Sequence, residues 1–322
     1  MKGKYSLQHR LAIDNPYKSV VKVFDCKEDD ILVGIKNVKS IPNTLMKKLE
    51  KTGFGLHTID KKSRLAGRAV DIELINPITG HYMSGSSSGT ALNVFAGIND
   101  LGIGNDGGGS VLAPAMCVNI YGFISKLIEE DRKQNLKPNT DGIVTTNSIG
   151  FMTRDKEILY KAIYDSIGIK PSEDYGLVFS DKEYENIKST TIEIKDPLLP
   201  RKELTDYLVD TLKKCDVFMI KEGPIDLYGF GDSLFGHFDE RTKKIQEQSG
   251  KGYVRVCNIA GATTMCIPCK ELGCATLLMC ESTKEKIEKL LCLSKYIEDV
   301  HDELIERYFL DLNNYYIDEY EV

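Results

Sequence analysis

The stretch SGSSSGT, residues 84 to 90, holds four serines, and a serine hydroxyl becomes a nucleophile when a neighbouring base takes its proton. Gly85, Ser87 and Gly89 satisfy the G-x-S-x-G pattern, in which a tight strand-to-helix turn exposes a serine. The same composition is typical of a flexible linker. Apolar residues recur at helical spacing from Thr90 to Ile98, so a helix is predicted directly after the serines, which argues against a linker.

A serine exposed on such a turn requires a strand before it and a histidine after it. The preceding residues, NPITGHYM, include Asn, Pro and Gly, which disfavour a strand. His237 lies in a predicted loop, and His301 lies on the solvated face of a helix predicted from about Thr283 to Tyr308. The sequence therefore offers little support to histidine-based catalysis at Ser87.

A second glycine-rich stretch, NDGGGS, spans residues 105 to 110. Three consecutive glycines, Gly107 to Gly109, can turn their backbone N–H groups toward one point beside Ser110. Converging N–H groups stabilise the oxyanion that forms when a serine attacks a carbonyl. An ordinary glycine turn has the same composition, so both interpretations remain open at this point.

Periodic segments on either side of these serines predict an α/β protein. SVVKVFD, ILVGIK and DVFMI have the pattern of strands, while NTLMKKLEKTG and RKELTDYLVDTLKKC have the pattern of helices. ATTMCIPC and CATLLMC predict a hairpin across the turn KELG. We expect a mixed, twisted sheet covered by helices on both faces. The chain has no internal repeat or proline-rich hinge, so residues 1–322 are predicted to form a single domain.

The composition excludes several classes of protein. The 322 residues carry a formal net charge of −6 and no basic run, which argues against a nucleic-acid partner. The N-terminal residues lack the apolar core of a signal peptide, and no run of about 18 apolar residues could cross a membrane. We therefore expect a cytoplasmic protein with no membrane partner.

Nine cysteines are present, and Cys266, Cys269, Cys274 and Cys280 interrupt one apolar segment. Cys266 and Cys269 have half of the spacing of a zinc ribbon, and Cys274 and Cys280 would share one face of a strand. A zinc site therefore stays open as an alternative. Cysteines that pack as small apolar side chains in a reducing compartment are the favoured interpretation, and no metal or cofactor is expected.

The segment SGSSSGTALNVFAGINDLGIGNDGGGSVLAPAMC resembles the amidase signature family, whose consensus is approximately GGSSGGSxxxVAxGxxxxxxGxDxGGSIRxPAxxC. The two align without a gap. The shared positions are Gly85, Ser86, Ser87, Gly89, Val94, Gly97, Gly104, Asp106, Gly108, Gly109, Ser110, Pro114 and Ala115. ILVGIKNVKSIPNT is similar to the family's strand-and-lysine segment and selects Lys36, and CNIAGATTMCIPC is similar to a later strand.

The resemblance implies a catalytic set of Lys36, Ser86 and Ser110. In that family the last serine attacks the carbonyl, the first serine lies at a cis peptide bond and relays the proton, and the lysine is the base. The resemblance also implies an oxyanion hole at Gly107, Gly108 and Gly109, with Asp106 accepting hydrogen bonds from the turn. Ser87 would then serve packing and hydrogen bonding only. Burial at the end of an apolar strand would lower the pKa of Lys36, as a neutral lysine base requires.

The chain departs from the family pattern in ways that bear on the substrate. It is shorter than most members, Leu112 stands where an arginine usually follows the nucleophile, and Ser84 and Ser88 replace flanking glycines. The leading hypothesis is an amidase that cleaves a small-molecule carboxamide through an acyl-enzyme on Ser110, as a monomer or a homo-oligomer. The alternatives are an amidase-like subunit of an amidotransferase and a catalytically silent binding protein derived from an amidase.

Overall fold

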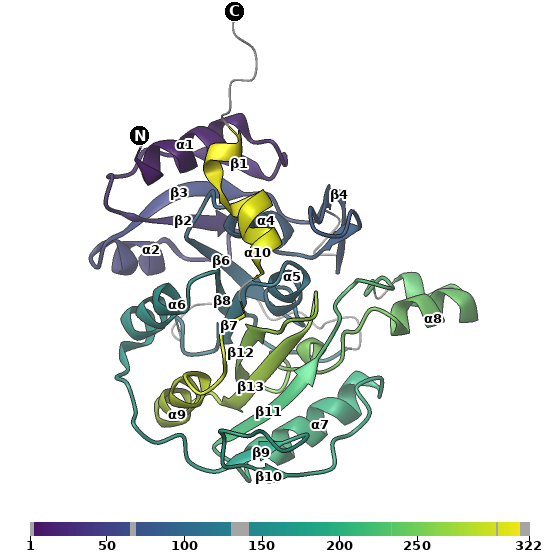
Figure 1. Cartoon of the computed structure of the whole chain (residues 1–322). Helices are drawn as coiled ribbons and strands as arrows, with labels where there is room; N and C mark the ends of the chain where they lie inside the picture. Colours follow the sequence, from purple (N-terminus) through teal and green to yellow (C-terminus); the bar gives the residue numbers. More distant parts are fainter. Residues whose placement is uncertain (1–2, 65–68, 130–141, 233, 301, 316–322) are drawn as a thin grey trace, which may run out of the picture.

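The computed structural model describes residues 3–64, 69–129, 142–232, 234–300 and 302–315 (Figure 1). Eleven strands in this part of the chain form one sheet, in the order β1 (Val20–Val23), β3 (Phe54–Asp60), β2 (Ile31–Lys36), β6 (Leu101–Asp106), β8 (Ser148–Thr153), β7 (Tyr121–Ser125), β12 (Ala262–Pro268), β13 (Ala275–Glu281), β11 (Val217–Glu222), β9 (Val178–Ser180) and β10 (Thr190–Thr191). Strands β4 (Val70–Ile75) and β5 (Tyr82–Ser84) form a separate hairpin.

The α-helices in the described residues are α1 (Lys4–Asp14), α2 (Asn43–Glu50), α4 (Ser88–Phe95), α5 (Leu112–Cys117), α6 (Lys156–Ile163), α7 (Arg201–Leu212), α8 (Glu240–Glu247), α9 (Lys284–Ser294) and α10 (Glu303–Ile305). The predicted α/β class is confirmed, and so is the hairpin of β12 and β13. The helix predicted from about Thr283 to Tyr308 is wrong, because α9 ends at Ser294. Within the described residues, every helix is too short or too polar to span a membrane.

Strand direction brings the ends of three strands together. β2 runs parallel to both of its neighbours, β3 and β6, so the carboxyl ends of all three lie at one edge of the sheet. Lys36 is in register with Asp60 of β3, and Ile35 is in register with Ile103 of β6. Ligands of α/β proteins bind outside the carboxyl ends of parallel strands. The edge that carries Lys36 therefore also carries the glycine turn that follows β6.

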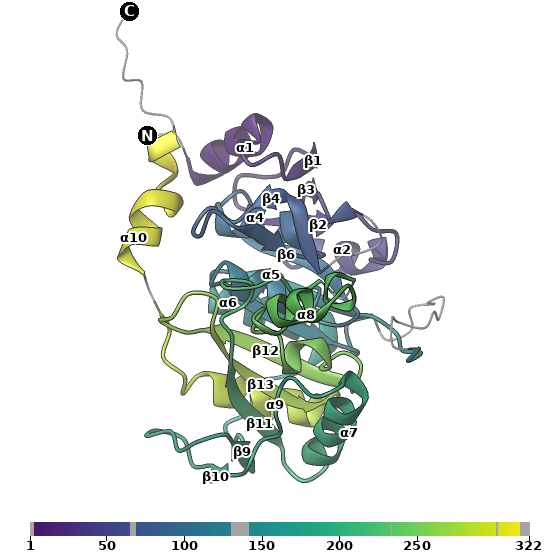
Figure 2. The same cartoon turned by 90° about the vertical axis from the view of Figure 1, so that its right-hand side faces the viewer.

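Helices cover both faces of the sheet, as predicted. One core cluster includes Val94 of α4, Leu112 of α5 and Leu208 of α7, all fully buried. The opposite cluster includes Leu45 of α2 and Leu159 of α6. In Figure 1, α2, α6 and α9 lie to the left of the strands and α7 lies to the right, and Figure 2 gives the same sheet from the side. The apolar stripe of each helix faces the sheet, which accounts for the helical spacing in the sequence.

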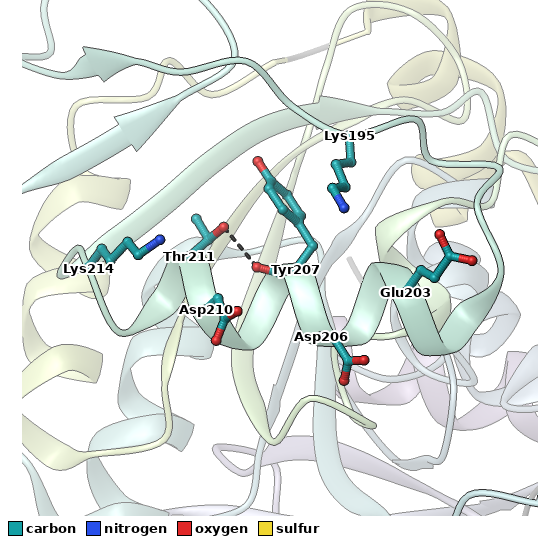
Figure 3. A pocket seen from close by; sticks show the side chains of 7 residues that line it. All are labelled: Lys195, Glu203, Asp206, Tyr207, Asp210, Thr211 and Lys214. Carbon is teal, nitrogen blue, oxygen red and sulfur yellow. Dashed lines mark hydrogen bonds between the residues drawn. The ribbon is translucent and has the colours of Figure 1, made fainter.

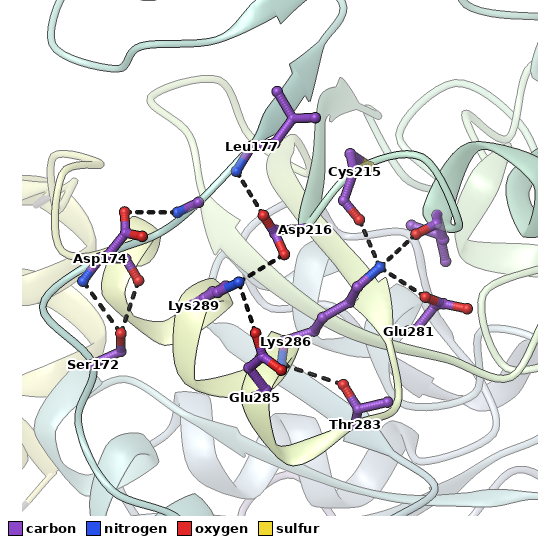
Figure 4. Close-up of polar contacts among 12 residues, drawn as sticks. Ser172, Asp174, Leu177, Cys215, Asp216, Glu281, Thr283, Glu285, Lys286 and Lys289 are labelled. Atoms are coloured by element: carbon purple, nitrogen blue, oxygen red, sulfur yellow. Dashed lines mark hydrogen bonds and ion pairs between the residues drawn. The ribbon is translucent and has the colours of Figure 1, made fainter.

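Two lysines of α9 bind the segment between α7 and β11 (Figure 4). The Lys286 ammonium donates to the carbonyl oxygens of Leu212 and Cys215 at 2.8 and 2.7 Å, where α7 ends without helical partners for its last carbonyls. Lys289 forms an ion pair with Asp216 at 2.9 Å. A cationic side chain at a helix C-terminus satisfies such free carbonyls. This cluster is thus a structural tie between α7, β11 and α9.

The cysteines pack as apolar side chains. Cys266 belongs to the core cluster on one face of the sheet and Cys280 to the cluster on the other. The sheet separates the two side chains, so they cannot ligate one metal ion. Among the described residues, no group of three or more His, Cys, Asp or Glu side chains is arranged to hold a metal. The zinc alternative is therefore wrong for this cluster.

Candidate active site

Lys36, the last residue of β2, is buried, with 3% of its surface exposed. Its ammonium donates to the Ser86 Oγ at 2.7 Å and lies 3.5 Å from the Asn105 carbonyl oxygen. The pKa of Lys36 is lowered to about 7, chiefly by burial; the carboxyl of Asp106 opposes this shift and the charge of Lys62 adds to it. A large share of Lys36 is therefore neutral near neutral pH, the form in which a lysine accepts a proton.

The serine turn lies between β5 and α4. The peptide bond between Gly85 and Ser86 is cis, as the resemblance implies for the first serine. The Ser63 N–H donates to the Ser86 carbonyl at 3.2 Å, and the Ser88 hydroxyl donates to the buried carboxylate of Asp71. Asp71 belongs to β4, and its sequence context shows no sign of a role beside the serines. The turn is thus held by hydrogen bonds at Ser86 and at Ser88.

The glycine turn after β6 is organised by the buried carboxylate of Asp106. It accepts hydrogen bonds from the backbone N–H groups of Gly109 at 2.6 Å and Val111 at 2.7 Å. The expectation that Asp106 holds the turn is confirmed. Gly109 has a φ of +98°, and a Cβ there would lie 3.0 Å from the Val254 carbonyl oxygen, so only glycine fits.

One part of the expected oxyanion hole needs correction. The Gly109 N–H donates to Asp106, and a single N–H cannot also point at a substrate oxyanion. The N–H groups of Gly107 and Gly108 have no hydrogen-bond acceptor among the described residues. Of the three glycine N–H groups expected to form the oxyanion hole, those of Gly107 and Gly108 therefore remain free.

The two serine turns contact each other through their backbones. The Ser87 N–H donates to the Ser110 carbonyl at 3.1 Å, so Ser110 and the residue after Ser86 are direct neighbours. Lys36, Ser86 and Ser110, which are far apart in the sequence, thus lie in one place. Ser110 is partly exposed, whereas Ser86 is only 5% exposed.

Ser87 is in a different position from the one that its G-x-S-x-G pattern suggests. A strand, β5, does precede it, contrary to the expectation from NPITGHYM. However, Ser87 has no exposed surface, and its hydroxyl lies against Gly104, where a Cβ would be 2.7 Å away. That hydroxyl has no hydrogen-bond partner among the described residues, so the expected hydrogen-bonding role is wrong. A buried serine cannot reach a substrate from solvent.

The other candidates for the site lie elsewhere. His237 is exposed in the 3-10 turn Phe235–His237, and His301 lies outside the described residues. Leu112, which stands where the family has an arginine, is fully buried in the core and contributes packing rather than charge. A surface hollow on α7, lined by Lys195, Tyr207 and charged neighbours, involves none of the serines (Figure 3).

Comparison with known proteins places this geometry in context. Residues 74–158, which include both serine turns, match the family model described as Amidase. A search of curated protein sequences found no significant match. A crystal structure of an amidase superposes with a TM-score of 0.58 at 13% identity, covering 92% of this chain and 95% of that chain.

Two further solved structures share the fold. One subunit of the glutamyl-tRNA(Gln) amidotransferase from Thermotoga maritima has a TM-score of 0.62 at 14% identity, covering 94% of this chain and 93% of that chain. Allophanate hydrolase from Kluyveromyces lactis has a TM-score of 0.59 at 13% identity, covering 91% of this chain and 69% of that chain. At these identities the likeness shows the fold.

The fold and the matched segment define a class, the hydrolases that act on carbon–nitrogen bonds other than peptide bonds. Within that class, residues 74–158 match the Amidase family model, and the chain has the fold of solved amidase structures. The resemblance seen in the sequence is thereby confirmed.

Proposed function

We propose that this protein hydrolyses a carboxamide through an acyl-enzyme on Ser110, with Ser86 as the proton relay and Lys36 as the base. The observation that carries the proposal is the contact of 2.7 Å between the Lys36 Nζ and the Ser86 Oγ at a buried position. Lysine activates a serine only when it is neutral and within hydrogen-bond reach. Its pKa of about 7 and this distance meet both requirements.

In the proposed acylation, the Ser110 Oγ attacks the amide carbonyl carbon and gives its proton to the Ser86 Oγ. Ser86 gives its own proton to the neutral Lys36 amine, so one proton moves from Ser110 to Lys36 overall. The oxyanion of the tetrahedral intermediate accepts hydrogen bonds from the N–H groups of Gly107 and Gly108, which have no other acceptor among the described residues.

Collapse of the intermediate breaks the carbon–nitrogen bond. Lys36 returns its proton through Ser86 to the leaving nitrogen, which departs as an amine or ammonia. A water molecule then attacks the Ser110 ester, and the same relay takes the proton of that water. The carboxylic acid leaves, and Ser110 and Lys36 regain their starting protonation states.

The direct test is to label the purified chain with a fluorophosphonate and to map the modified peptide by mass spectrometry. The proposal expects one adduct, on Ser110. An adduct on Ser87 would favour the G-x-S-x-G interpretation. Absence of any adduct would favour a silent binding protein, and labelling without amide turnover by the chain alone would favour an amidotransferase subunit that needs a partner.

We predict that the labelling rate depends on pH through Lys36. Because only the neutral amine accepts a proton, the rate should rise about tenfold per pH unit below the pKa of about 7 and become constant above it. Stopped-time labelling between pH 5 and pH 9 measures this curve. A rate that stays constant across that range contradicts a lysine base.

We predict opposite outcomes for two neighbouring serines. Ser86→Ala removes the relay and the hydroxyl that Lys36 contacts, so the labelling rate of Ser110 should fall by about 10²- to 10⁴-fold. Ser87→Ala removes a buried hydroxyl without a partner, so labelling should stay within about twofold and the free energy of unfolding should stay equal or rise. Equal losses in the two variants would contradict the assignment.

The proposal also covers the domain organisation, the substrate class and the cellular location of the protein. We propose that residues 1–322 act as one domain on a small-molecule amide in the cytoplasm. The support is one sheet that runs from β1 to β10 across the described chain and the net charge of −6, which disfavours polyanionic partners.

A further inference from the structure

The segment Lys251–Arg255 lies behind both serine turns. It follows α8 and precedes β12, more than 140 residues after Ser110 in the sequence. One end is joined through the Ala69 carbonyl to the turn that carries Ser86, and the other end lies against the turn that carries Ser110. Two buried acidic side chains, Asp226 and Glu222, hold this segment in place.

The first contact runs through Lys251. Its ammonium forms an ion pair with Asp226 at 2.6 Å, and the two side chains are only 6% and 2% exposed. The same ammonium donates to the Ala69 carbonyl oxygen at 3.1 Å, and that oxygen also accepts the Gly85 N–H at 2.8 Å. Lys251 is therefore joined through one shared carbonyl to Gly85, the residue directly before Ser86.

The second contact runs through Glu222, the buried last residue of β11. Its carboxylate accepts the backbone N–H groups of Gly252, Tyr253 and Val254 at 2.8, 2.6 and 3.1 Å. The carbonyl oxygens of Val254 and Arg255 lie directly against the glycine turn. A Cβ at Gly109 would lie 3.0 Å from the Val254 oxygen, and one at Gly108 would lie 3.3 Å from the Arg255 oxygen. Glu222 thus fixes the surface on which the Ser110 turn rests.

We infer that Lys251 and Glu222 are positioning residues that set the separation of the Ser86 and Ser110 turns. This inference rests on the proposed function, in which a proton passes between the two serine hydroxyls. Such transfer requires the two hydroxyls to come within hydrogen-bond reach in the substrate complex, and a displacement of about 1 Å can cost about 100-fold in rate. A buried ion pair contributes little net stability compared with apolar packing of the same volume, so a role in fixing geometry accounts for its presence better than stability does.

The test measures phosphonate labelling of Ser110 in the folded full-length chain, with the maximal labelling rate and the half-saturating probe concentration determined separately. Glu222→Gln keeps the shape of the side chain but sets an amide N–H₂ against backbone N–H donors. Lys251→Met/Asp226→Asn removes both buried charges together, while the Asn oxygen can still accept the Gly231 N–H, which now donates to Asp226 at 2.9 Å. Lys243→Met and Glu240→Gln on α8, where both side chains are mainly exposed, are the matched controls.

We expect the maximal labelling rate to fall by about 10- to 100-fold in Glu222→Gln and in the double variant, with the half-saturating concentration within about twofold of wild type and the controls unchanged. Circular dichroism and the free energy of unfolding identify any variant that does not fold, and the double variant avoids leaving one buried charge unpaired. Folded variants that label at the wild-type rate would overturn the positioning role. A wild-type chain that does not label on Ser110 would instead overturn the proposed function.

Discussion

Ser110→Ala is expected to abolish amide turnover and fluorophosphonate labelling. In the proposed mechanism Ser110 forms the acyl bond, and no other serine hydroxyl of the two turns combines partial exposure with two free N–H groups in the same turn. Removal of the nucleophile of a serine hydrolase costs on the order of 10⁶-fold in kcat. The measurement is turnover of an amide panel, together with intact-mass labelling of the variant.

The fold should be unaffected by this change. The Ser110 side chain is partly exposed, and no hydrogen bond of its hydroxyl is present among the described residues, so the free energy of unfolding should change by less than about 0.5 kcal/mol. Turnover near the wild-type level in a folded Ser110→Ala variant would show that another group carries the acyl chain.

Lys36→Met is the second change with a large expected effect. Methionine fills a similar volume but accepts no proton, so Ser86 would lose the base that its hydroxyl contacts at 2.7 Å. General base catalysis contributes about 10²- to 10⁴-fold, and we expect the labelling rate of Ser110 to fall by that amount. The remaining labelling should also lose its rise through pH 7, because Lys36 titrates at about that pH.

The stability of this variant gives an independent check. A lysine whose folded pKa lies below its unfolded value destabilises the folded state, and the cost is greatest below the folded pKa of about 7, where the buried amine must be charged. Lys36→Met removes that cost, so its advantage in unfolding free energy should be larger at pH 6 than at pH 10. A variant that labels at the wild-type rate with the wild-type pH curve would exclude Lys36 as the base.

Local patterns in the sequence were enough to predict much of this molecule. Helical spacing after Thr90 predicts α4, alternating and apolar runs predict β2, β11 and the β12–β13 hairpin, and the ungapped block from residue 84 to residue 117 selects the family. These features can be predicted from the sequence because burial imposes a regular spacing on the apolar residues of each helix and strand. After Ser294 burial no longer imposes that spacing, and the helix predicted to about Tyr308 extends past the end of α9.

The contacts that decide the chemistry depended on the tertiary structure. Ser87 and Ser110 both sit in glycine-rich turns, and only the packing of Ser87 against Gly104 withdraws its hydroxyl from solvent. Lys36 and Ser86 are 50 residues apart in the sequence and form a hydrogen bond. The parallel pairing of β2 and β6 places the end of β2 beside the start of the Ser110 turn. The hydrogen bond from the Gly109 N–H to Asp106 and the link from Lys251 through the Ala69 carbonyl to Gly85 likewise depend on the folded geometry. A sequence pattern records which residue types are present, but hydrogen bonds depend on distance and direction, which are set only when the strands, turns and helices pack together.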